Sequence, residues 1–377
     1  MKNFFVVICV AVVVICAGCI GESKVVTADM IGGKISQTAE VKPDPIEEQL
    51  KAMTLEEKIG QMMMIGFYGT EINDDIRYML NNFHVGGIIL FDRNMESVAQ
   101  VKKLTDDLQA LGGKKIPLLI STDEEGGRVA RGKNFLEVAP SQESIGQSGD
   151  PANATHWAKF NANLLKNFGV NINLAPVADV GSRDTRSFGD DAQTVAEFVN
   201  ASANGYESEN FLYTLKHFPG IGKSKIDPHH APSNIEDSRE ILDAQDLPPF
   251  AKIVRGHDNS KFMVMIGHLK YDAIDAANSA SISPAVINGL LRGELGFGGV
   301  VITDDLEMGA IKNEVDPPRI GVLMIQAGGD IALACHNYEM QQKIFDNILD
   351  AVRRGEISET RIDESVRRIL KLKANLS

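Results

Sequence analysis

Hydrophobic residues in most of the chain come in short continuous runs, and stretches with helical periodicity separate one run from the next. Eight runs follow one another, at 62–67, 85–91, 116–121, 169–174, 211–215, 262–266, 299–302 and 331–334. The runs are continuous and do not alternate with polar residues, which is expected of parallel strands covered on both faces. The intervening stretches are predicted to be the helices that cover them.

Helices are predicted from apolar residues spaced three and four apart and from capping signals. Thr54-Leu55-Glu56-Glu57 has the pattern of a capping box. Later helices are expected at 73–83, 97–111, about 154–168, 190–210, 241–255, 284–294 and 319–327, with two more before the end of the chain. This order predicts an α/β fold, a single (β/α)8 TIM-type barrel. A doubly wound open sheet is the alternative, because strand count alone does not show closure.

The first 45 residues do not share this pattern. Lys2 precedes an apolar run that ends at Ala17, which is the layout of an export signal. Because residues 16–19 read CAGC and resemble a lipobox, residues 1–19 are predicted to be a lipoprotein-type signal with Cys19 lipidated. An uncleaved membrane-spanning anchor is the alternative.

Residues 20–45 are poor in large apolar side chains and are predicted to be a flexible tether. Residues 46–377 remain as the barrel domain. The signal and the tether together predict that this domain lies outside the cytoplasm, held at the membrane by the lipid anchor.

Charge and cysteine content narrow the function. The chain has 38 Lys and Arg residues against 51 Asp and Glu residues, a formal net charge of −13, which argues against a nucleic-acid partner. Of its 4 cysteines only Cys335 falls in the barrel domain, so neither a disulfide framework nor zinc-ligand spacing is found there. We predict no cofactor and no metal.

Polar and ionisable side chains follow the carboxyl ends of successive runs. In a barrel these ends form one rim, and barrel enzymes hold their active sites there. The candidates are Asp123, Arg131, Arg186, Lys216, His217, His268 and Asp304. A helix cap or a loop ion pair would explain any one of them, but their coincidence at one rim predicts a functional site.

The stretch 215–230 holds the candidate residues for acid and base catalysis. Lys216 and His217 end an apolar run, and a glycine-bearing loop then leads to Asp227-Pro228-His229-His230. A carboxylate two residues before an imidazole can orient it for general acid and base catalysis. A metal-dependent hydrolase that uses the histidines with Asp304 is the competing interpretation. HxH and HExxH spacings are absent from the sequence, however, and Lys216 would repel a cation.

Three motifs in order carry a family resemblance. Residues 123–131 read DEEGGRVAR, 216–220 read KHFPG and 301–308 read VITDDLEM. They are similar to the barrel domain of glycoside hydrolase family 3, and Asp227-x-His229 is similar to its β-N-acetylhexosaminidase branch. The resemblance runs from about residue 46 to the end of the chain. It implies a retaining, exo-acting enzyme that hydrolyses terminal β-linked N-acetylglucosamine-type residues of an oligosaccharide or cell-envelope glycan.

The resemblance also implies roles for single residues. Asp304 matches the nucleophile, with Asp305 as its rival. His229, paired with Asp227, matches the group that protonates the leaving oxygen and then deprotonates water, with His230 as its rival. The positions that match or suggest sugar-binding residues are Asp123, Arg131, Arg186, Lys216, His217 and, more weakly, His268.

Departures from the family pattern leave alternatives open. Ile221 stands where the branch usually has histidine, and Pro228 stands where it usually has serine. Many β-glucosidases of the family take their acid from a second domain, and we expect none after Ser377, which favours the hexosaminidase branch. A β-glucosidase-like or phosphorylase specificity and a non-catalytic carbohydrate-binding lipoprotein are the other interpretations.

Overall fold

The structure is a computed structural model that describes residues 44–376, except 182–183, 223–233 and 313. Ile46–Ser377 forms one compact unit. Cys19, the predicted signal and almost all of the predicted tether lie outside the described residues, and so do Asp227 and His229. No helix in the described part of the chain has the length and apolar character needed to cross a bilayer.

Each of the eight apolar runs overlaps a parallel strand of the barrel, and β3, β5 and β9 extend one to three residues beyond their predicted runs. The strands are β1 (Met63–Ile65), β2 (Gly87–Ile89), β3 (Leu119–Thr122), β4 (Ile172–Asn173), β5 (Tyr213–Phe218), β7 (Phe262–Ile266), β9 (Val300–Thr303) and β10 (Ala332–Ala334). One sheet has the order β10-β1-β2-β3-β4 and a second has the order β5-β7-β9.

Two parallel bridges join these sheets into a closed barrel. Ile172 of β4 pairs with Leu212, the residue before β5, and Ile302 of β9 pairs with Ile331, the residue before β10. The sheet therefore closes on itself. The predicted (β/α)8 barrel is confirmed and the open sheet is excluded.

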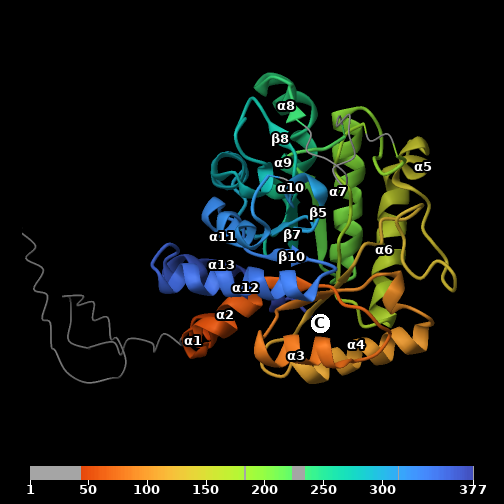
Figure 1. The fold of residues 1–377 in the computed structure, drawn as a ribbon. Coiled ribbons are helices and arrows are strands. Elements are labelled where there is room, and N and C mark those ends of the chain that lie inside the picture. Colours follow the sequence, from red (N-terminus) through yellow and green to blue (C-terminus); the bar gives the residue numbers. More distant parts are fainter. Residues whose placement is uncertain (1–43, 182–183, 223–233, 313, 377) are drawn as a thin grey trace, which may run out of the picture. The chain divides into compact units, whose positions relative to one another are not determined.

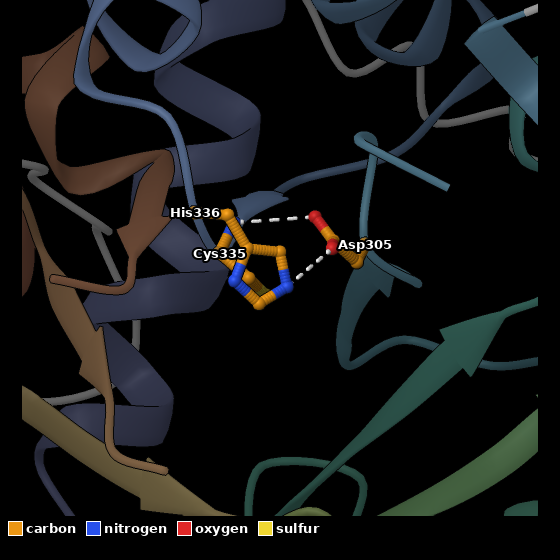
Figure 2. Close-up of side chains that lie close together, drawn as sticks. All are labelled: Asp305, Cys335 and His336. Atoms are coloured by element: carbon orange, nitrogen blue, oxygen red, sulfur yellow. Dashed lines mark hydrogen bonds and ion pairs between the residues drawn. The ribbon is translucent and has the colours of Figure 1, made fainter. Parts of the chain in front are cut away.

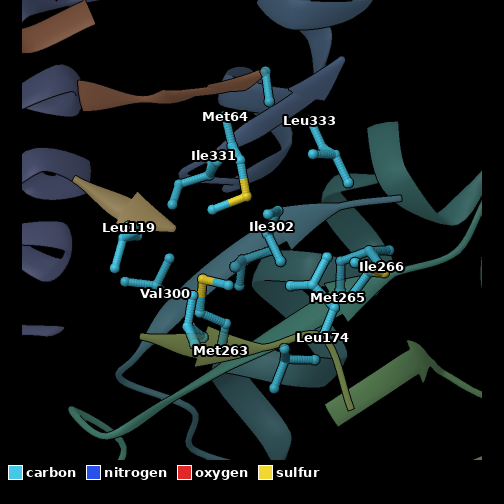
Figure 3. Packing of buried hydrophobic residues seen from close by; sticks show 14 of the residues in the cluster. Met64, Leu119, Leu174, Met263, Met265, Ile266, Val300, Ile302, Ile331 and Leu333 are labelled. Atoms are coloured by element: carbon cyan, nitrogen blue, oxygen red, sulfur yellow. The ribbon is translucent and has the colours of Figure 1, made fainter. Parts of the chain in front are cut away.

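Aliphatic and methionine side chains fill the inside of the barrel. Figure 3 shows Met64, Met263, Met265, Ile302 and Leu333 packed together, and each is at most 2% exposed. Interior side chains of this kind make a barrel a packed core and not a pore. The upper layer of this core is the floor on which a ligand at the rim would rest.

Helices surround the strands (Figure 1). Their bounds are α1 (Pro45–Ala52), α2 (Leu55–Gln61), α3 (Asp74–Asn82), α4 (Val98–Gly112), α5 (Gln142–Gln147), α6 (Pro151–Asn167), α7 (Ala192–Ser208), α8 (Arg239–Gln245), α9 (Pro248–Gly256), η3 (Ala285–Glu294), α10 (Gly309–Lys312), α11 (Pro317–Ala327), α12 (Tyr338–Arg353) and α13 (Glu359–Lys373). The capping box is confirmed, because the Thr54 hydroxyl accepts from the Glu57 N–H while the Glu57 carboxylate accepts from the Thr54 N–H.

The helix prediction was wrong in detail at two places. The single helix predicted at 241–255 is two helices, because Pro248 and Pro249 lack the N–H that a continuous helix needs and instead begin α9. The segment predicted at 284–294 is a π-helix, η3. Three short helices (α1, α5, α10) and the pair of two-residue strands β6 (Asn234–Ile235) and β8 (Lys270–Tyr271) were not predicted.

Asp330 ties the barrel together on the amino-terminal side of β10. Its side chain is fully buried. One carboxylate oxygen accepts from the Val301 N–H at 2.9 Å and from Arg292 at 2.7 Å. The other accepts from Arg368 at 2.9 Å and from the Ser365 hydroxyl at 2.6 Å. A single carboxylate thus links β9, η3 and α13 at the place where the sheet closes.

Candidate active site

A cavity of about 290 Å³ opens at the carboxyl ends of the strands. Six of the candidate residues line it, namely Asp123, Arg131, Arg186, Lys216, His217 and Asp304. Its apolar lining includes Ile89, Leu174, Met265 and Leu333, which come from the upper layer of the barrel core. The expectation that strand-end polar residues from distant parts of the sequence meet at one rim therefore holds for these six.

Asp304 directly follows β9. Its N–H donates to the Ile266 carbonyl of β7 at 2.9 Å, and its Oδ1 accepts from the Asp305 N–H at 2.8 Å. Burial acts to raise the pKa of Asp304, but the nearby imidazoles of His217 and His268 and the hydrogen bond from Asp305 outweigh it. The pKa of Asp304 therefore lies below its ordinary value, and the carboxylate is ionised at neutral pH, as a nucleophile must be.

His217 is held by a carboxylate that sequence reasoning did not assign. Its Nδ1 lies 2.8 Å from Oδ2 of Asp179, and its backbone N–H donates to Oδ1 at 3.1 Å. Since Nδ1 donates to this buried carboxylate, Nε2 is turned into the cavity, 3.4 Å from Arg186 and 4.0 Å from Asp304. Asp179 follows the fourth apolar run, so the strand-end pattern was the signal that could have found it.

Asp179→Asn is expected to lower kcat/KM about 10- to 100-fold, the usual cost of losing the partner that orients a site residue. The amide can donate to Nδ1, which moves the ring proton to Nε2, where Arg186 offers only donors. The Nε2–H then faces Asp304, 4.0 Å away, and a hydrogen bond to this carboxylate lowers the pKa of Asp304 further and weakens it as a nucleophile. The acid limb of the pH profile of kcat/KM should therefore move to lower pH. A variant that is merely less stable would show a lower melting temperature with the limb unmoved, and that result would contradict the assignment.

Lys216 lies between two carboxylates. Its Nζ is 2.7 Å from Oδ1 of Asp123 and 2.7 Å from Oε1 of Glu125. Arg131 lies 3.3 Å from the other oxygen of Asp123. The Asp123 carboxylate is thus fixed by two cations on the cavity wall, which is how a group that accepts from ligand hydroxyls is kept in place.

Glu125 is a second residue that sequence reasoning missed. It accepts from Nε and Nη2 of Arg186, both at 2.8 Å. Burial acts to raise the pKa of Glu125, but Lys216 and Arg186 outweigh it and hold this pKa well below its ordinary range. Glu125 therefore stays ionised and orients both cations beside the cavity. It lies in the same motif as Asp123, and nothing in the sequence alone distinguishes the two roles.

His268 does not lie on the cavity wall, so its assignment as a direct sugar-binding residue needs correction. Its ring is buried, with Nδ1 2.8 Å from the Ser281 hydroxyl and Nε2 3.0 Å from the Asp305 carbonyl. Both nitrogens are engaged within the protein. The contact with the Asp305 carbonyl supports a role in holding the chain that carries Asp304. The position at a strand end did not by itself show whether the side chain would reach the cavity.

Figure 2 shows Asp305, Cys335 and His336 close together at the ends of β9 and β10. Their ligand atoms lie within 4.8 Å of one another, which is close enough to hold a metal ion. Arg93, however, lies 3.1 Å from Nδ1 of His336. A guanidinium can only donate, so Nδ1 is an acceptor and Nε2 carries the ring proton.

That proton directs Nε2 of His336 toward Oδ2 of Asp305, 3.4 Å away. A histidine that binds metal through Nε2 donates from its other nitrogen, and the position of Arg93 forbids this. The three residues are therefore better described as part of a hydrogen-bonded chain from Arg93 through His336 to Asp305. The pKa of Asp305 is raised to about 7, mainly by burial and to a smaller extent by the negative charge of Glu307. His336 follows the eighth apolar run, so here too the strand-end pattern was the available signal.

The predicted acid and base residues, Asp227 and His229, lie outside the described residues and stay a prediction. Ile221, near the start of the loop that carries them, donates its N–H to Asp179 at 2.9 Å. This is the carboxylate that holds His217. The loop therefore starts beside the cavity.

A barrel with an ionised carboxylate at its rim, surrounded by fixed charged donors and acceptors, is the site of a barrel enzyme that acts on a polar, hydroxyl-rich ligand. Residues 54–372 match the Glycosyl hydrolase family 3 N terminal domain. The chain belongs to glycosyl hydrolase family 3.

Individual relatives agree with this assignment. Beta-hexosaminidase of Stenotrophomonas maltophilia is 36% identical over 303 residues, covering 78% of this chain and 87% of that protein. Beta-hexosaminidase A of Pseudoalteromonas piscicida is 31% identical over 338 residues, covering 81% of this chain and 56% of that protein. The structure of a family 3 beta-N-acetylglucosaminidase from Paenibacillus sp. str. FPU-7 has a TM-score of 0.83 and 41% identity, covering 86% of this chain and 63% of that chain. The chain thus spans somewhat over half the length of the last two.

Proposed function

We propose that this protein is a retaining, exo-acting β-N-acetylhexosaminidase that hydrolyses terminal β-linked N-acetylglucosamine-type residues. The observation that carries the proposal is the ionised Asp304 at a cavity whose wall holds five fixed charged or polar side chains. We call these five the clamp: Asp123, Arg131, Arg186, Lys216 and His217. The relatives named beta-hexosaminidase and beta-N-acetylglucosaminidase support the same substrate class. The substrate is an oligosaccharide or a cell-envelope glycan.

Asp304 acts as the nucleophile. Its Oδ1 accepts from the Asp305 N–H, so Oδ2 attacks the anomeric carbon. The glycosidic bond breaks as His229, oriented by Asp227, gives a proton to the leaving oxygen. In the second half, His229 takes a proton from water, the water attacks the anomeric carbon, and the bond to Asp304 breaks. Two displacements at one carbon give net retention of configuration.

The clamp binds the terminal sugar. Asp123 accepts from ring hydroxyls, and Arg131, Arg186, Lys216 and His217 surround them, each with a carboxylate partner that limits its freedom. Groups held in this way lose little entropy when a ligand binds.

We also propose that the protein is a lipoprotein anchored at Cys19 on the outer side of the membrane. The amino-terminal sequence supports this, since a charged residue, an apolar run and a lipobox-like CAGC follow one another. Mass spectrometry of the membrane-extracted protein should find an acylated Cys19 as the first residue. Recovery of an unmodified chain that begins at Met1 would contradict the proposal.

Turnover of 4-nitrophenyl N-acetyl-β-glucosaminide tests the activity. We expect the first-formed sugar to be the β-anomer by proton NMR and the rate to be unchanged by a chelator. An α-anomer as first product would contradict retention, and a higher kcat/KM for the β-glucoside would contradict the substrate class. Formation of sugar 1-phosphate in phosphate buffer would assign the protein as a phosphorylase.

A further inference from the structure

We propose that Tyr68 is the stacking platform of a leaving-group subsite, which binds the sugar next to the one that is removed. The proposal rests on the proposed function and adds that the natural leaving group is itself a sugar ring. Tyr68 follows β1 at the barrel rim, and its exposed fraction is 51%. A tyrosine has an apolar ring and a polar hydroxyl, which suits it to contact a ligand that is apolar on one face and polar at its edge.

The exposure of Tyr68 does not come from a loosely held loop. The Phe67 carbonyl accepts from Arg93 at 2.9 Å and from Asn94 at 3.1 Å, and the Gly69 carbonyl accepts from Asn94 at 2.8 Å. The Tyr68 carbonyl accepts from Asn73 at 2.7 Å, and its N–H donates to the Tyr338 hydroxyl at 3.2 Å. The backbone on both sides of Tyr68 is thus fixed, and its ring is presented to solvent in advance, as a binding platform requires.

An aromatic and cationic surface connects Tyr68 with the cavity. The Arg93 guanidinium carbon lies 4.5 Å from the centre of the Tyr68 ring and 4.4 Å from the centre of the Phe91 ring. Phe91 lines the cavity together with His336, and the centres of these two rings are 5.5 Å apart. The surface is therefore continuous from the wall around the terminal sugar, through Arg93, to Tyr68.

The chemistry of this surface fits a neutral pyranose. The C–H face of a sugar packs on an aromatic ring, while its hydroxyls need polar groups at the ring edge. Tyr68 offers the ring, and the Tyr338 hydroxyl, which accepts from the Tyr68 N–H, is a polar group beside it. Binding energy gained where the second sugar packs on Tyr68 can lower the activation barrier for cleavage of the glycosidic bond.

The test compares a disaccharide with a glycoside that has no second ring. For each variant, kcat/KM is measured with N,N′-diacetylchitobiose and with methyl N-acetyl-β-glucosaminide, and the ratio of the two is taken. In Tyr68→Ala this ratio should fall about 3- to 10-fold relative to wild type, the range expected for one lost aromatic stack. Tyr68→Phe keeps the ring and should keep the ratio within about twofold.

Tyr78→Ala is the matched control, because Tyr78 is 52% exposed but lies on α3, where its ring packs against Phe83 and not against Arg93. Its ratio should equal that of wild type. An unchanged ratio in Tyr68→Ala overturns the subsite and leaves the proposed function intact. Absence of turnover of both substrates by the wild-type protein overturns the proposed function, and the subsite with it.

Discussion

Asp304→Asn is expected to lower kcat for 4-nitrophenyl N-acetyl-β-glucosaminide by about 10⁴-fold or more, the order of loss seen when a covalent nucleophile is removed. The amide has the size of the carboxylate, and its oxygen can still accept from the Asp305 N–H. It lacks the negative charge that attacks the anomeric carbon and stabilises positive charge in the transition state. Initial rates at high enzyme concentration measure the loss.

Asp305→Asn is the control, because Asp305 is the adjacent carboxylate on the same cavity wall. Its carboxylate accepts from the Cys335 and Glu307 N–H groups and faces His336, so its role is to hold the rim. We expect a fall of no more than about 100-fold. In Asp304→Ala the shorter side chain leaves this side of the sugar open, so azide should restore turnover by attack from there and give an α-glycosyl azide. Loss of activity in Asp305→Asn alone would transfer the nucleophile to Asp305.

Asp330→Asn is expected to lower the free energy of unfolding by about 3–5 kcal/mol, the cost of removing one partner from a buried ion pair. The fully buried carboxylate accepts from Arg292 and Arg368 and from the Val301 N–H. The amide would leave two partly buried guanidinium groups without their anion and would place an N–H₂ group against donors.

Chemical denaturation monitored by circular dichroism measures the effect. Asp107→Asn is the matched control, because Asp107 forms an exposed i,i+4 pair with Lys103 on α4. The change there should be under about 0.5 kcal/mol. Equal midpoints for the two variants would show that Asp330 does not hold the closure of the barrel.

The barrel could be predicted because its cause is local. Each strand is a short apolar run, and each helix has its own periodicity and caps, as Thr54 and Glu57 illustrate. The division of 241–255 into α8 and α9 was also visible as Pro248-Pro249, and it was missed because apolar periodicity continues across the two prolines. The π-helical hydrogen bonding of η3 carries no comparable signal in its composition.

The site could be predicted only in part. The strand-end pattern and the family motifs found Asp304, Lys216 and His217, because residues at the carboxyl end of a parallel strand lie at the rim. The same rule assigned His268 to the cavity, although His268 does not line it and both ring nitrogens are engaged within the protein. At the end of a strand the side of the sheet that a side chain faces depends on the local turn, which a single sequence does not specify.

The sequence by itself determined the strand and helix order, the family and the set of ionisable residues at the rim. Only the tertiary structure decided which of these residues are paired: Asp179 with His217, Glu125 with Arg186 and Lys216, and Arg93 with His336. The physical reason is that apolar patterning acts between near neighbours in the chain. Charge pairing and proton positions depend instead on distances of a few ångström between strands that are far apart in sequence.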